Sequence, residues 1–463
     1  MLSFTTVQNV VQKYGIMGLS QAISIPSVNI HLGDFPKENL LQILTVAKEW
    51  ALSMIPRAQI QILEQEDKTP LLFLKIPAYQ SCSEKSILFY GHFDKQPAGP
   101  GWSYPAYQAT HDDDRLYGRG TADDCYSFYT AILCAYLCRT NHLSHPPIFG
   151  IFETDEEAGS NDLPYWLEKI QNQHRLNPSH LLILDLDGPT TDRLWLTKST
   201  RGVLSFHLQI NTLKQPVHSG VAGGVCPSAF RVFRSLLSRL EDRHTGKVLV
   251  STSHTHIPPH ILQALKQTAK IHSSLNFPWM HTTQPAGNNA LDRLINSTWA
   301  PSLRVLGLDH IPSTNNAMAV IHPKIQAKIA IRLPPDIRAK QVYQNIQNLL
   351  QKDPPYQCNV TVYQPHISPG FVAKNLDKNW YQTWEQCNQE LFGKTTLYTF
   401  QGGSIGILQR FEKQFPRAIP LLTGVVSPAN QIHGPNEFIS ISYWCKLIYT
   451  LSRLLAQRNK NAS

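Results

Sequence analysis

Three short apolar segments of this chain are each followed at once by acidic side chains or by histidine. The segments are residues 86–90, 148–152 and 181–184, and the polar residues after them are His92 and Asp94, then Glu153, Asp155, Glu156 and Glu157, then Asp185 and Asp187. Apolar runs of this length are typical of buried strands, and helical stretches separate them here. Because open α/β sheets bind ligands at the carboxyl ends of their strands, the pattern predicts an α/β fold with a mainly parallel sheet flanked by helices and a site at that edge.

The pattern changes after Thr200-Arg201-Gly202. Residues 203–210 and 325–333 alternate between apolar and polar side chains, as strands with one solvated face do. Further elements are expected as helices at 36–54, 125–138, 228–240, 339–350, 380–391 and 438–457, and as strands at 58–63, 71–76 and 358–363. We therefore predict a smaller α/β sandwich at 204–368, inserted into a larger domain formed by 1–203 and 369–463.

Composition excludes several classes of protein. The net charge of +9 comes from scattered lysines and arginines, so we expect no nucleic-acid partner. The start of the chain resembles no secretory signal, and no apolar run is long enough for a membrane span. The eight cysteines form no CxxC pair, which favours reduced thiols and a cytoplasmic location.

The strand ends supply the ligands of a metal site. His92, Asp123, Glu157 and Asp185 offer imidazole and carboxylate without thiolate, which suits Zn²⁺ or Mn²⁺. A carboxylate such as Asp123 can bridge two ions, and His433 is the candidate for the remaining ligand.

Acidic residues next to the candidate ligands are expected to orient a ligand or to act as a base. Asp94 is expected to orient the His92 imidazole. Of the adjacent pair Glu156 and Glu157, one can bind metal while the other serves as a general base, since side chains alternate along an extended backbone. Asp187 is the alternative to Asp185 as a metal ligand. The aspartates at 112–114 are expected in a solvated turn rather than at the metal.

Several motifs, in this order along nearly the whole chain, resemble one known family. They are Gly91-His92-Phe93-Asp94-Lys95-Gln96-Pro97-Ala98, Leu116 to Asp124, Glu156-Glu157-Ala158-Gly159-Ser160, His218-Ser219-Gly220 with Gly223-Gly224, Leu291 to Leu294 with Pro301 to Leu303, Gly402-Gly403-Ser404-Ile405, and His433-Gly434-Pro435-Asn436-Glu437. The chain is thus similar to the di-zinc metallopeptidases that include carnosinases, carboxypeptidase G, aminoacylase and succinyl-diaminopimelate desuccinylase. The Gln-Pro-Ala sequence is similar to that of the dipeptidase branch.

The resemblance implies two divalent ions, with zinc expected first and manganese as the alternative. It implies that Asp123 bridges them, that His92 and Asp185 complete one site, and that Glu157 and His433 complete the other. Glu156 would act as the general base toward a metal-bridged hydroxide. The inserted domain would be a lid that also forms a homodimer, in which His218 polarises the scissile carbonyl of the partner's substrate.

Substrate contacts are also implied. Arg332 would hold a substrate carboxylate, with a structural salt bridge as the alternative, and Gly403 and Ser404 would lie at the substrate. The chain departs from the family pattern at Cys125, Tyr126, Gln401 and Gly406, and at 318–322, where Asn315 or Asn316 could substitute for the usual contact.

Three functions remain open at this point. The first is a dipeptidase or small carboxypeptidase, and the second is a deacylase of N-acyl amino acids built on the same metal core. The third is a binding protein that keeps the fold without catalysis. Retention of all expected ligands and of Glu156 favours an enzyme.

Overall fold

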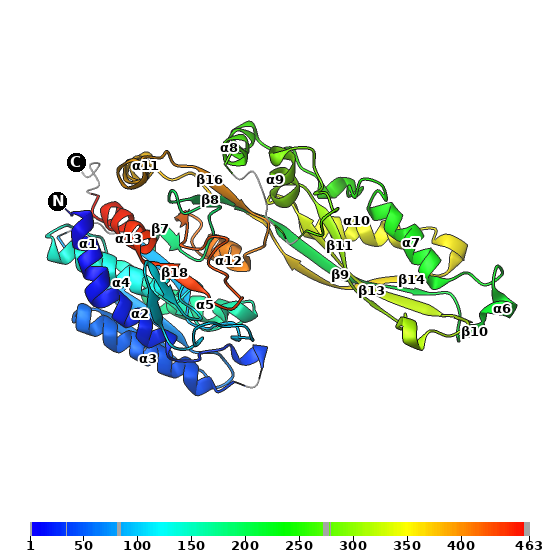
Figure 1. The fold of residues 1–463 in the computed structure, drawn as a ribbon, viewed down its shortest axis with the longest axis horizontal. Helices are drawn as coiled ribbons and strands as arrows, with labels where there is room; N and C mark the ends of the chain where they lie inside the picture. Colours follow the sequence, from blue (N-terminus) through cyan, green and yellow to red (C-terminus); the bar gives the residue numbers. More distant parts are fainter. Residues whose placement is uncertain (1, 34, 81–84, 272–276, 278, 458–463) are drawn as a thin grey trace. The chain divides into compact units, whose positions relative to one another are not determined.

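The structure is a computed structural model that describes residues 2–33, 35–80, 85–271, 277 and 279–457 (Figure 1). Its chain divides into two compact units. The first contains residues 1–198, 373–399 and 410–463, and the second contains residues 199–372 and 400–409. The sequence placed the inserted segment at 204–368; the structure in addition assigns residues 400–409, which lie far beyond that segment, to the second unit.

The first unit is built on a six-stranded sheet of order β1-β2-β6-β3-β7-β17. Strands β3, β6, β7 and β17 run parallel, whereas β1 and β2 add an antiparallel edge. The bounds are β1 Gln59–Leu63, β2 Leu71–Ile76, β3 Ser86–His92, β6 Ile148–Glu153, β7 Pro178–Ile183 and β17 Ile419–Leu422. Every residue of β3 is buried, as a central parallel strand requires.

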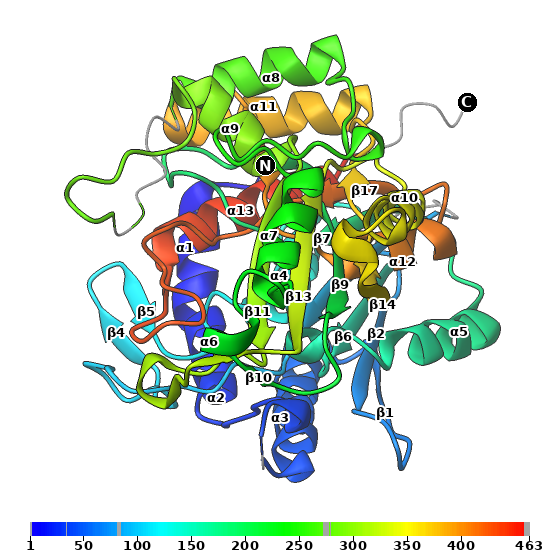
Figure 2. The same cartoon turned by 90° about the vertical axis from the view of Figure 1, so that its right-hand side faces the viewer.

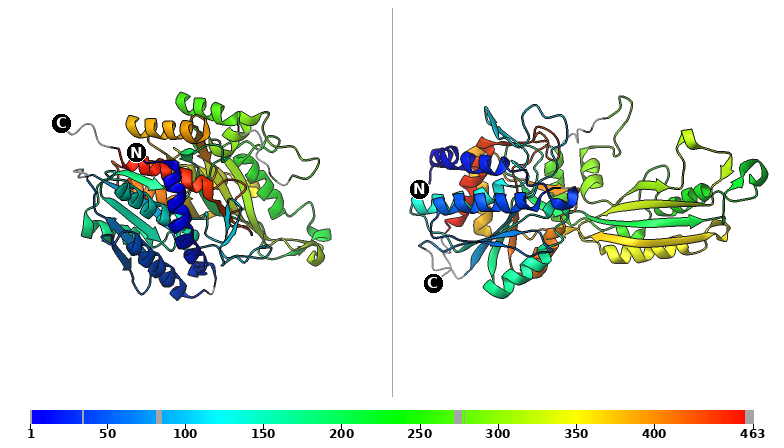
Figure 3. Two further views of the ribbon diagram at one scale, coloured as in Figure 1. Left: turned by 60° about the vertical axis from the view of Figure 1, so that its left-hand side comes forward. Right: turned by 90° about the horizontal axis from the view of Figure 1, so that it is seen from below.

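Helices cover this sheet. Helix α4 packs on β3 and β6 and is itself covered by α3 and α13, while α13 also contacts α1 and α11 (Figure 3). The helices are α1 Phe4–Val10, α2 Ile16–Ile23, α3 Lys37–Met54, α4 Tyr126–Thr140, α5 Leu163–His174, α11 Lys378–Phe392 and α13 Ile441–Leu455, with a π-helical turn at Val11–Gly15 between α1 and α2. Helix α12 Gly406–Gln414 begins in residues of the second unit and ends in residues of the first. Among the described residues, no helix has both the length and the apolar character needed to cross a membrane.

Two small sheets of described residues also lie outside the inserted segment. One has the order β18-β5-β4, from Phe438–Ser440, Arg115–Tyr117 and Thr110–Asp112, and the other has the order β15-β8-β16, from Phe371–Val372, Leu196–Thr200 and Tyr398–Gln401. The β4–β5 turn is the acidic turn expected at 112–114. Asp112 and Asp113 are exposed there, and the Asp114 carboxylate accepts hydrogen bonds from Ser442 at the start of α13.

One expected helix begins later than the sequence suggested. The apolar pattern from 438 predicted a single helix to 457, but Phe438–Ser440 is a strand paired with β5 and α13 begins at Ile441. The Ser440 hydroxyl accepts a hydrogen bond from the Tyr443 amide, so it caps α13 and fixes where the helix starts.

The second unit contains a four-stranded antiparallel sheet of order β11-β13-β9-β14. Its strands are β9 Gly202–Asn211, β11 Ser302–Asp309, β13 Lys324–Leu333 and β14 Asn359–Ser368, with a two-stranded ribbon of β10 Val217–His218 and β12 Val320–Ile321. Helices α7 Ala229–Leu240 and α10 Ala339–Gln351 cover one sheet face around a second apolar core (Figure 2). The unit also holds α6 Ser219–Ala222, α8 Pro259–Ala269 and α9 Ala290–Thr298.

The expected fold class is confirmed. The mainly parallel sheet lies between helices, and a smaller α/β layer is formed largely by the inserted segment. The seven cysteines in the described part of the chain are free, as expected, and Cys82 lies outside the described residues.

Candidate metal centre

His92 ends β3, and its ring is held by Asp94. The imidazole is fully buried, and its Nδ1 lies 3.0 Å from the Asp94 carbonyl and 3.4 Å from the Asp94 carboxylate. Its Nε2 is buried and makes no hydrogen bond of acceptable geometry within the described chain, although Asp123 Oδ1 lies 3.2 Å away. The ring nitrogen that faces the acids is therefore available as a ligand.

Asp123 lies on a loop that Glu437 organises. The buried Glu437 carboxylate accepts hydrogen bonds from the amides of Gly120 (3.0 Å), Ala122 (3.0 Å) and Asp123 (3.2 Å), and from Arg119 Nη1 (2.7 Å). The peptide bond between Asp123 and Asp124 is cis. The amide hydrogen bonds to Glu437 fix the backbone that carries Asp123.

The Asp123 carboxylate lies between two histidines. One oxygen is 3.2 Å from His92 Nε2, and the other is 2.9 Å from His433 Nε2. A carboxylate in this position can bridge two cations.

The adjacent glutamates point to different ligand groups. Glu156 lies with His92 and Asp185, and Glu157 lies with Asp123 and His433, each group having its ligand atoms within 4.8 Å of one another. The sequence argument assumed extended backbone here, but the segment is a 3-10 turn, Glu156–Ala158. The two carboxylates diverge because of this turn rather than through the alternation of a strand.

Asp94 also holds this turn. Its two carboxylate oxygens accept hydrogen bonds from the amides of Glu156 (3.2 Å) and Glu157 (3.0 Å). Asn29, whose side chain is buried, donates to the same carboxylate at 2.8 Å. Sequence reasoning missed Asn29, since a single Asn in a polar stretch gives no signal of its own.

The last two candidate ligands are Asp185, just after β7, and His433, on a loop near the end of the chain. Asp185 Oδ2 lies 3.8 Å from His92 Nε2, whereas Asp187 forms a backbone bridge with Val426 and belongs to neither ligand group. His433 has a backbone φ of 62°, and its loop is closed at the base by the buried Asn430, which accepts from Ser427 and donates to the Phe438 carbonyl at 2.6 Å. The structure thus brings Asp185, not Asp187, to the cluster.

Electrostatics in the cluster follow from crowded acids. Burial raises the pKa of Glu156 to about 7, and the neighbouring Glu157 and Asp123 act in the same direction while His92 opposes them. Burial and the charge of Asp123 raise the pKa of Asp185. Hydrogen bonds to Asp123 and Glu157 raise the pKa of His433 to about 10. A cation placed between these side chains would therefore be stabilised by the crowded carboxylates.

The cluster fits divalent cations. It gathers four carboxylates and two imidazoles, and no lysine or arginine forms an ion pair with any of them in the described part of the chain. The unpaired, fully buried His92 Nε2 points into the group. Such nitrogen and oxygen donors suit zinc-like ions.

The predicted substrate residues lie in the second unit. Arg332 is half-buried, has no ion-pair partner within the described chain, and donates from Nη1 to the Ser404 hydroxyl at 3.4 Å. The alternative of a structural salt bridge therefore finds no support. Gly403 and His218 are exposed, and His218 Nδ1 accepts from the Gly220 amide at 3.1 Å. Their roles stay predictions.

The departures from the family pattern after Asp124 are buried. Cys125 and Tyr126 both belong to the main apolar core, and burial raises the pKa of the Cys125 thiol to about 12, so it is neutral. The Tyr126 hydroxyl donates to the Leu184 carbonyl, immediately before Asp185. Tyr126 thus supports the strand end that carries a candidate ligand.

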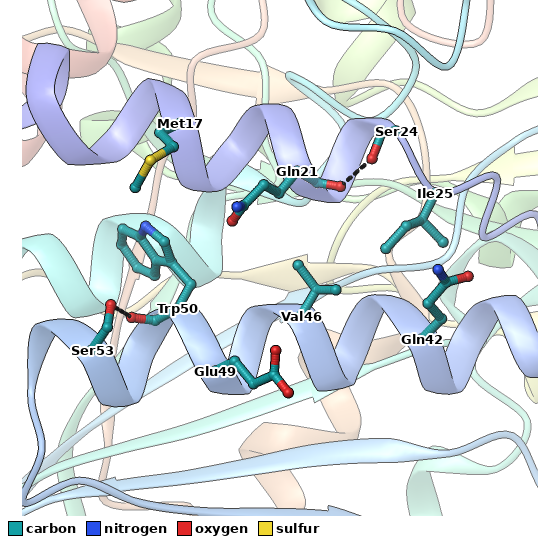
Figure 4. Close-up of a pocket in the computed structure, with 9 residues that line it drawn as sticks. All are labelled: Met17, Gln21, Ser24, Ile25, Gln42, Val46, Glu49, Trp50 and Ser53. Carbon is teal, nitrogen blue, oxygen red and sulfur yellow. Dashed lines mark hydrogen bonds between the residues drawn. The ribbon is translucent and has the colours of Figure 1, made fainter.

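A surface pocket between α2 and α3 is a different kind of feature (Figure 4). Its volume is about 370 Å³, and Glu49 is the only acid among its nine lining residues, which include no histidine or cysteine. Ser24 and Ser53 in this pocket each donate to a backbone carbonyl of their own helix. It therefore offers no second metal centre.

The part of the chain that carries the candidate ligands is similar to known proteins. Residues 88–457 match the model of Peptidase family M20/M25/M40. The chain is 24% identical over 408 residues to the cysteinylglycine-S-conjugate dipeptidase of Corynebacterium striatum, covering 85% of each protein. It is 26% identical over 365 residues to the human Beta-Ala-His dipeptidase, covering 77% of this chain and 71% of that one.

Solved structures share the fold. Human carnosine dipeptidase 1 aligns with a TM-score of 0.71 at 20% identity, covering 98% of each chain. The metallo-carboxypeptidase Sso-CP2 of Sulfolobus solfataricus aligns with a TM-score of 0.73 at 18% identity, covering 95% of this chain and 97% of that one. With the family match spanning most of the sequence and the ligand groups in place, this chain belongs to Peptidase family M20/M25/M40 and is a metallopeptidase.

Proposed function

We propose that this protein is a dipeptidase that hydrolyses the amide bond of dipeptides with two bound divalent cations, zinc ahead of manganese. The observation that carries the proposal is the Asp123 carboxylate, which lies within 3.2 Å of His92 and 2.9 Å of His433 and so joins the two ligand groups. The relatives named above are dipeptidases, which favours this substrate class.

The proposed ligand assignment keeps one acid free. His92 and Asp185 would hold one cation, Glu157 and His433 the other, and Asp123 both. Cations bound there would polarise the scissile carbonyl and lower the pKa of a water molecule. Glu156 then accepts the proton of the attacking water and delivers it to the leaving nitrogen.

Asp94 would orient the His92 ring and the turn that carries the base. Arg332 would bind the carboxylate of the substrate through its planar guanidinium, with Gly403 and Ser404 beside it. The absence of a carboxylate partner for Arg332 in the described chain supports this assignment.

We further propose a cytoplasmic homodimer in which His218 acts in the partner's site. Strand β11 is a sheet edge, and its Val305, Leu306 and Leu308 side chains are exposed, as expected of a strand that a second copy covers. Mixing His218→Ala with Glu156→Gln chains would restore activity if the sites are shared. Mixed dimers without activity would contradict sharing.

A substrate panel tests the activity. Zinc-loaded protein should hydrolyse Cys-Gly or β-Ala-His, and Glu156→Gln should lose that activity. Cleavage of N-acyl amino acids with dipeptides left intact would instead establish the deacylase alternative.

A second comparison tests Arg332. Arg332→Met should raise KM for free dipeptides but not for dipeptide amides, because only the former carry the carboxylate. Arg338, exposed before α10, provides the matched control Arg338→Met, which should leave KM unchanged. Equal KM changes for both substrates would contradict the assignment.

A further inference from the structure

One buried carboxyl oxygen outside the ligand groups receives two side-chain hydrogen bonds. Glu153 ends β6 and is 2% exposed. Its Oε1 accepts from the Tyr90 hydroxyl at 2.5 Å and from the Ser160 hydroxyl at 2.9 Å. Its Oε2 is buried without a hydrogen-bond partner in the described chain.

These three residues enclose the turn that bears the base. Glu153 precedes the 3-10 turn of Glu156–Ala158, and Ser160 follows it with a backbone φ of 53°. The Ser160 amide also donates to the Asp155 carbonyl at 2.6 Å. The bond between Ser160 and Glu153 therefore joins the two ends of the turn.

Tyr90 connects the turn to the strand that carries His92. It lies in β3, two residues before His92, and its buried ring packs edge-on against Phe411 at 5.0 Å. The Glu153 oxygen thus fixes the turn against β3 at a second place, independent of the Asp94 carboxylate. Asp94 holds the amides of Glu156 and Glu157, whereas Glu153 holds the far end of the turn.

Burying the Glu153 carboxyl is energetically unfavourable, and apolar packing does not account for a carboxyl at this place. Glu153 has no basic ion-pair partner in the described chain and lies near the charges of Asp94 and Glu156. Burying a polar atom without a partner, as for Oε2, is unfavourable. The position contributes a shared acceptor, and both donors belong to segments that carry candidate site residues.

We propose that Glu153 is a positioning residue, which sets the place of the general base Glu156 through Ser160 and Tyr90. The inference rests on the proposed function, since it takes Glu156 as the base. It assigns Glu153 no contact with substrate and no part in proton transfer.

Variants at Glu153 separate shape from charge. Glu153→Gln keeps an acceptor oxygen for both donors, so kcat should stay within about threefold of wild type. Glu153→Ala removes the acceptor and should lower kcat about 100-fold with KM and metal content unchanged, because a displacement of about 1 Å suffices for such a loss. Tyr90→Phe and Ser160→Ala should each lower kcat in the same direction.

Thr154→Val is the matched control. Thr154 is buried next to Glu153, but its hydroxyl donates to the Pro70 carbonyl, away from the turn. This variant should keep kcat. Equal kcat losses in Thr154→Val and Glu153→Ala would show general destabilisation and overturn the proposal, as would a loss in Glu153→Gln as large as that in Glu153→Ala.

A second readout does not depend on activity. Amide hydrogen exchange across residues 156–160 should be faster in zinc-loaded Glu153→Ala than in wild type, and unchanged in Glu153→Gln. Unchanged exchange in Glu153→Ala would overturn the inference even if the protein cleaves dipeptides. If the wild-type protein cleaves none of the panel substrates, the proposed function fails and the exchange comparison still decides whether Glu153 positions the turn.

Discussion

Replacing Glu437 should destabilise both the loop that carries Asp123 and the loop that carries His433. The Glu437 carboxylate binds three amides of the loop that ends at Asp123, and it pairs with Arg119, whose Nη2 donates to the Gly434 carbonyl beside His433 at 2.9 Å. Both charged side chains are at most 1% exposed. Glu437→Ala therefore leaves a buried guanidinium without its carboxylate and three amides without their acceptor.

The expected loss of stability is large. Removing one partner of a buried ion pair costs about 3–5 kcal/mol, and amides that lose their acceptor add roughly 1 kcal/mol each when water cannot replace it. Together these terms predict a loss of about 6–8 kcal/mol in the free energy of unfolding for Glu437→Ala. Glu437→Gln, which keeps an acceptor oxygen, should lose less. Both variants should bind zinc more weakly, because Asp123 and His433 lie on the affected loops.

Urea unfolding and zinc titration measure these effects. The matched control is Glu390→Ala, which removes an ion pair with Arg453 whose carboxylate side is 49% exposed and which should cost about 1 kcal/mol or less. If Glu437→Ala does not fold, the stability and zinc affinity of Glu437→Gln are compared with those of the control instead. Losses for both Glu437 variants no larger than that of Glu390→Ala would refute the reasoning.

Two further predictions concern the base and a buried histidine. Glu156→Gln should lower kcat by about 10²–10⁴-fold while metal content stays unchanged, as measured by turnover and elemental analysis, and a variant that loses its metal would contradict the role of a base alone. Burial lowers the pKa of His145 to about 4. Between pH 6.5 and 4 the unfolded chain binds a proton there that the folded chain does not, so stability falls as pH falls. From pH 7 to pH 5, His145→Gln should lose about 2 kcal/mol less stability than wild type in urea unfolding. Equal losses would contradict that depressed pKa.

Much of the site could be predicted because its ligands directly follow strands or sit in short motifs. An apolar run ending at His92 or before Asp185 shows where a parallel strand stops, and parallel strands place their carboxyl ends at one edge. Asp185 and Asp187 follow the same apolar run. Asp185 is the ligand expected from the sequence, and of the two it is Asp185 that lies in a ligand group.

Other parts depend on pairing that local sequence does not encode. Phe438–Ser440 continues a helical apolar pattern, yet it forms a strand because β5, far away in the sequence, supplies the partner. The bond between Glu437 and Arg119 likewise joins residues 318 positions apart. Glu437 was visible as the acid that ends the His433 motif, but nothing local indicated what it binds.

Tyr126 illustrates a different limit. The sequence showed that it departs from the family pattern but not which way its side chain faces. The structure places its ring in the core and its hydroxyl on the Leu184 carbonyl. Whether an unusual side chain faces substrate or core depends on the helix packing around it.

The metal content of the protein tests the central claim most directly. We predict that protein reconstituted with zinc and freed of excess metal binds two ions per chain by elemental analysis, and that Asp123→Asn binds fewer because both groups share that carboxylate. Fewer than one ion per chain in the wild-type protein, or two retained ions in Asp123→Asn, would contradict the account.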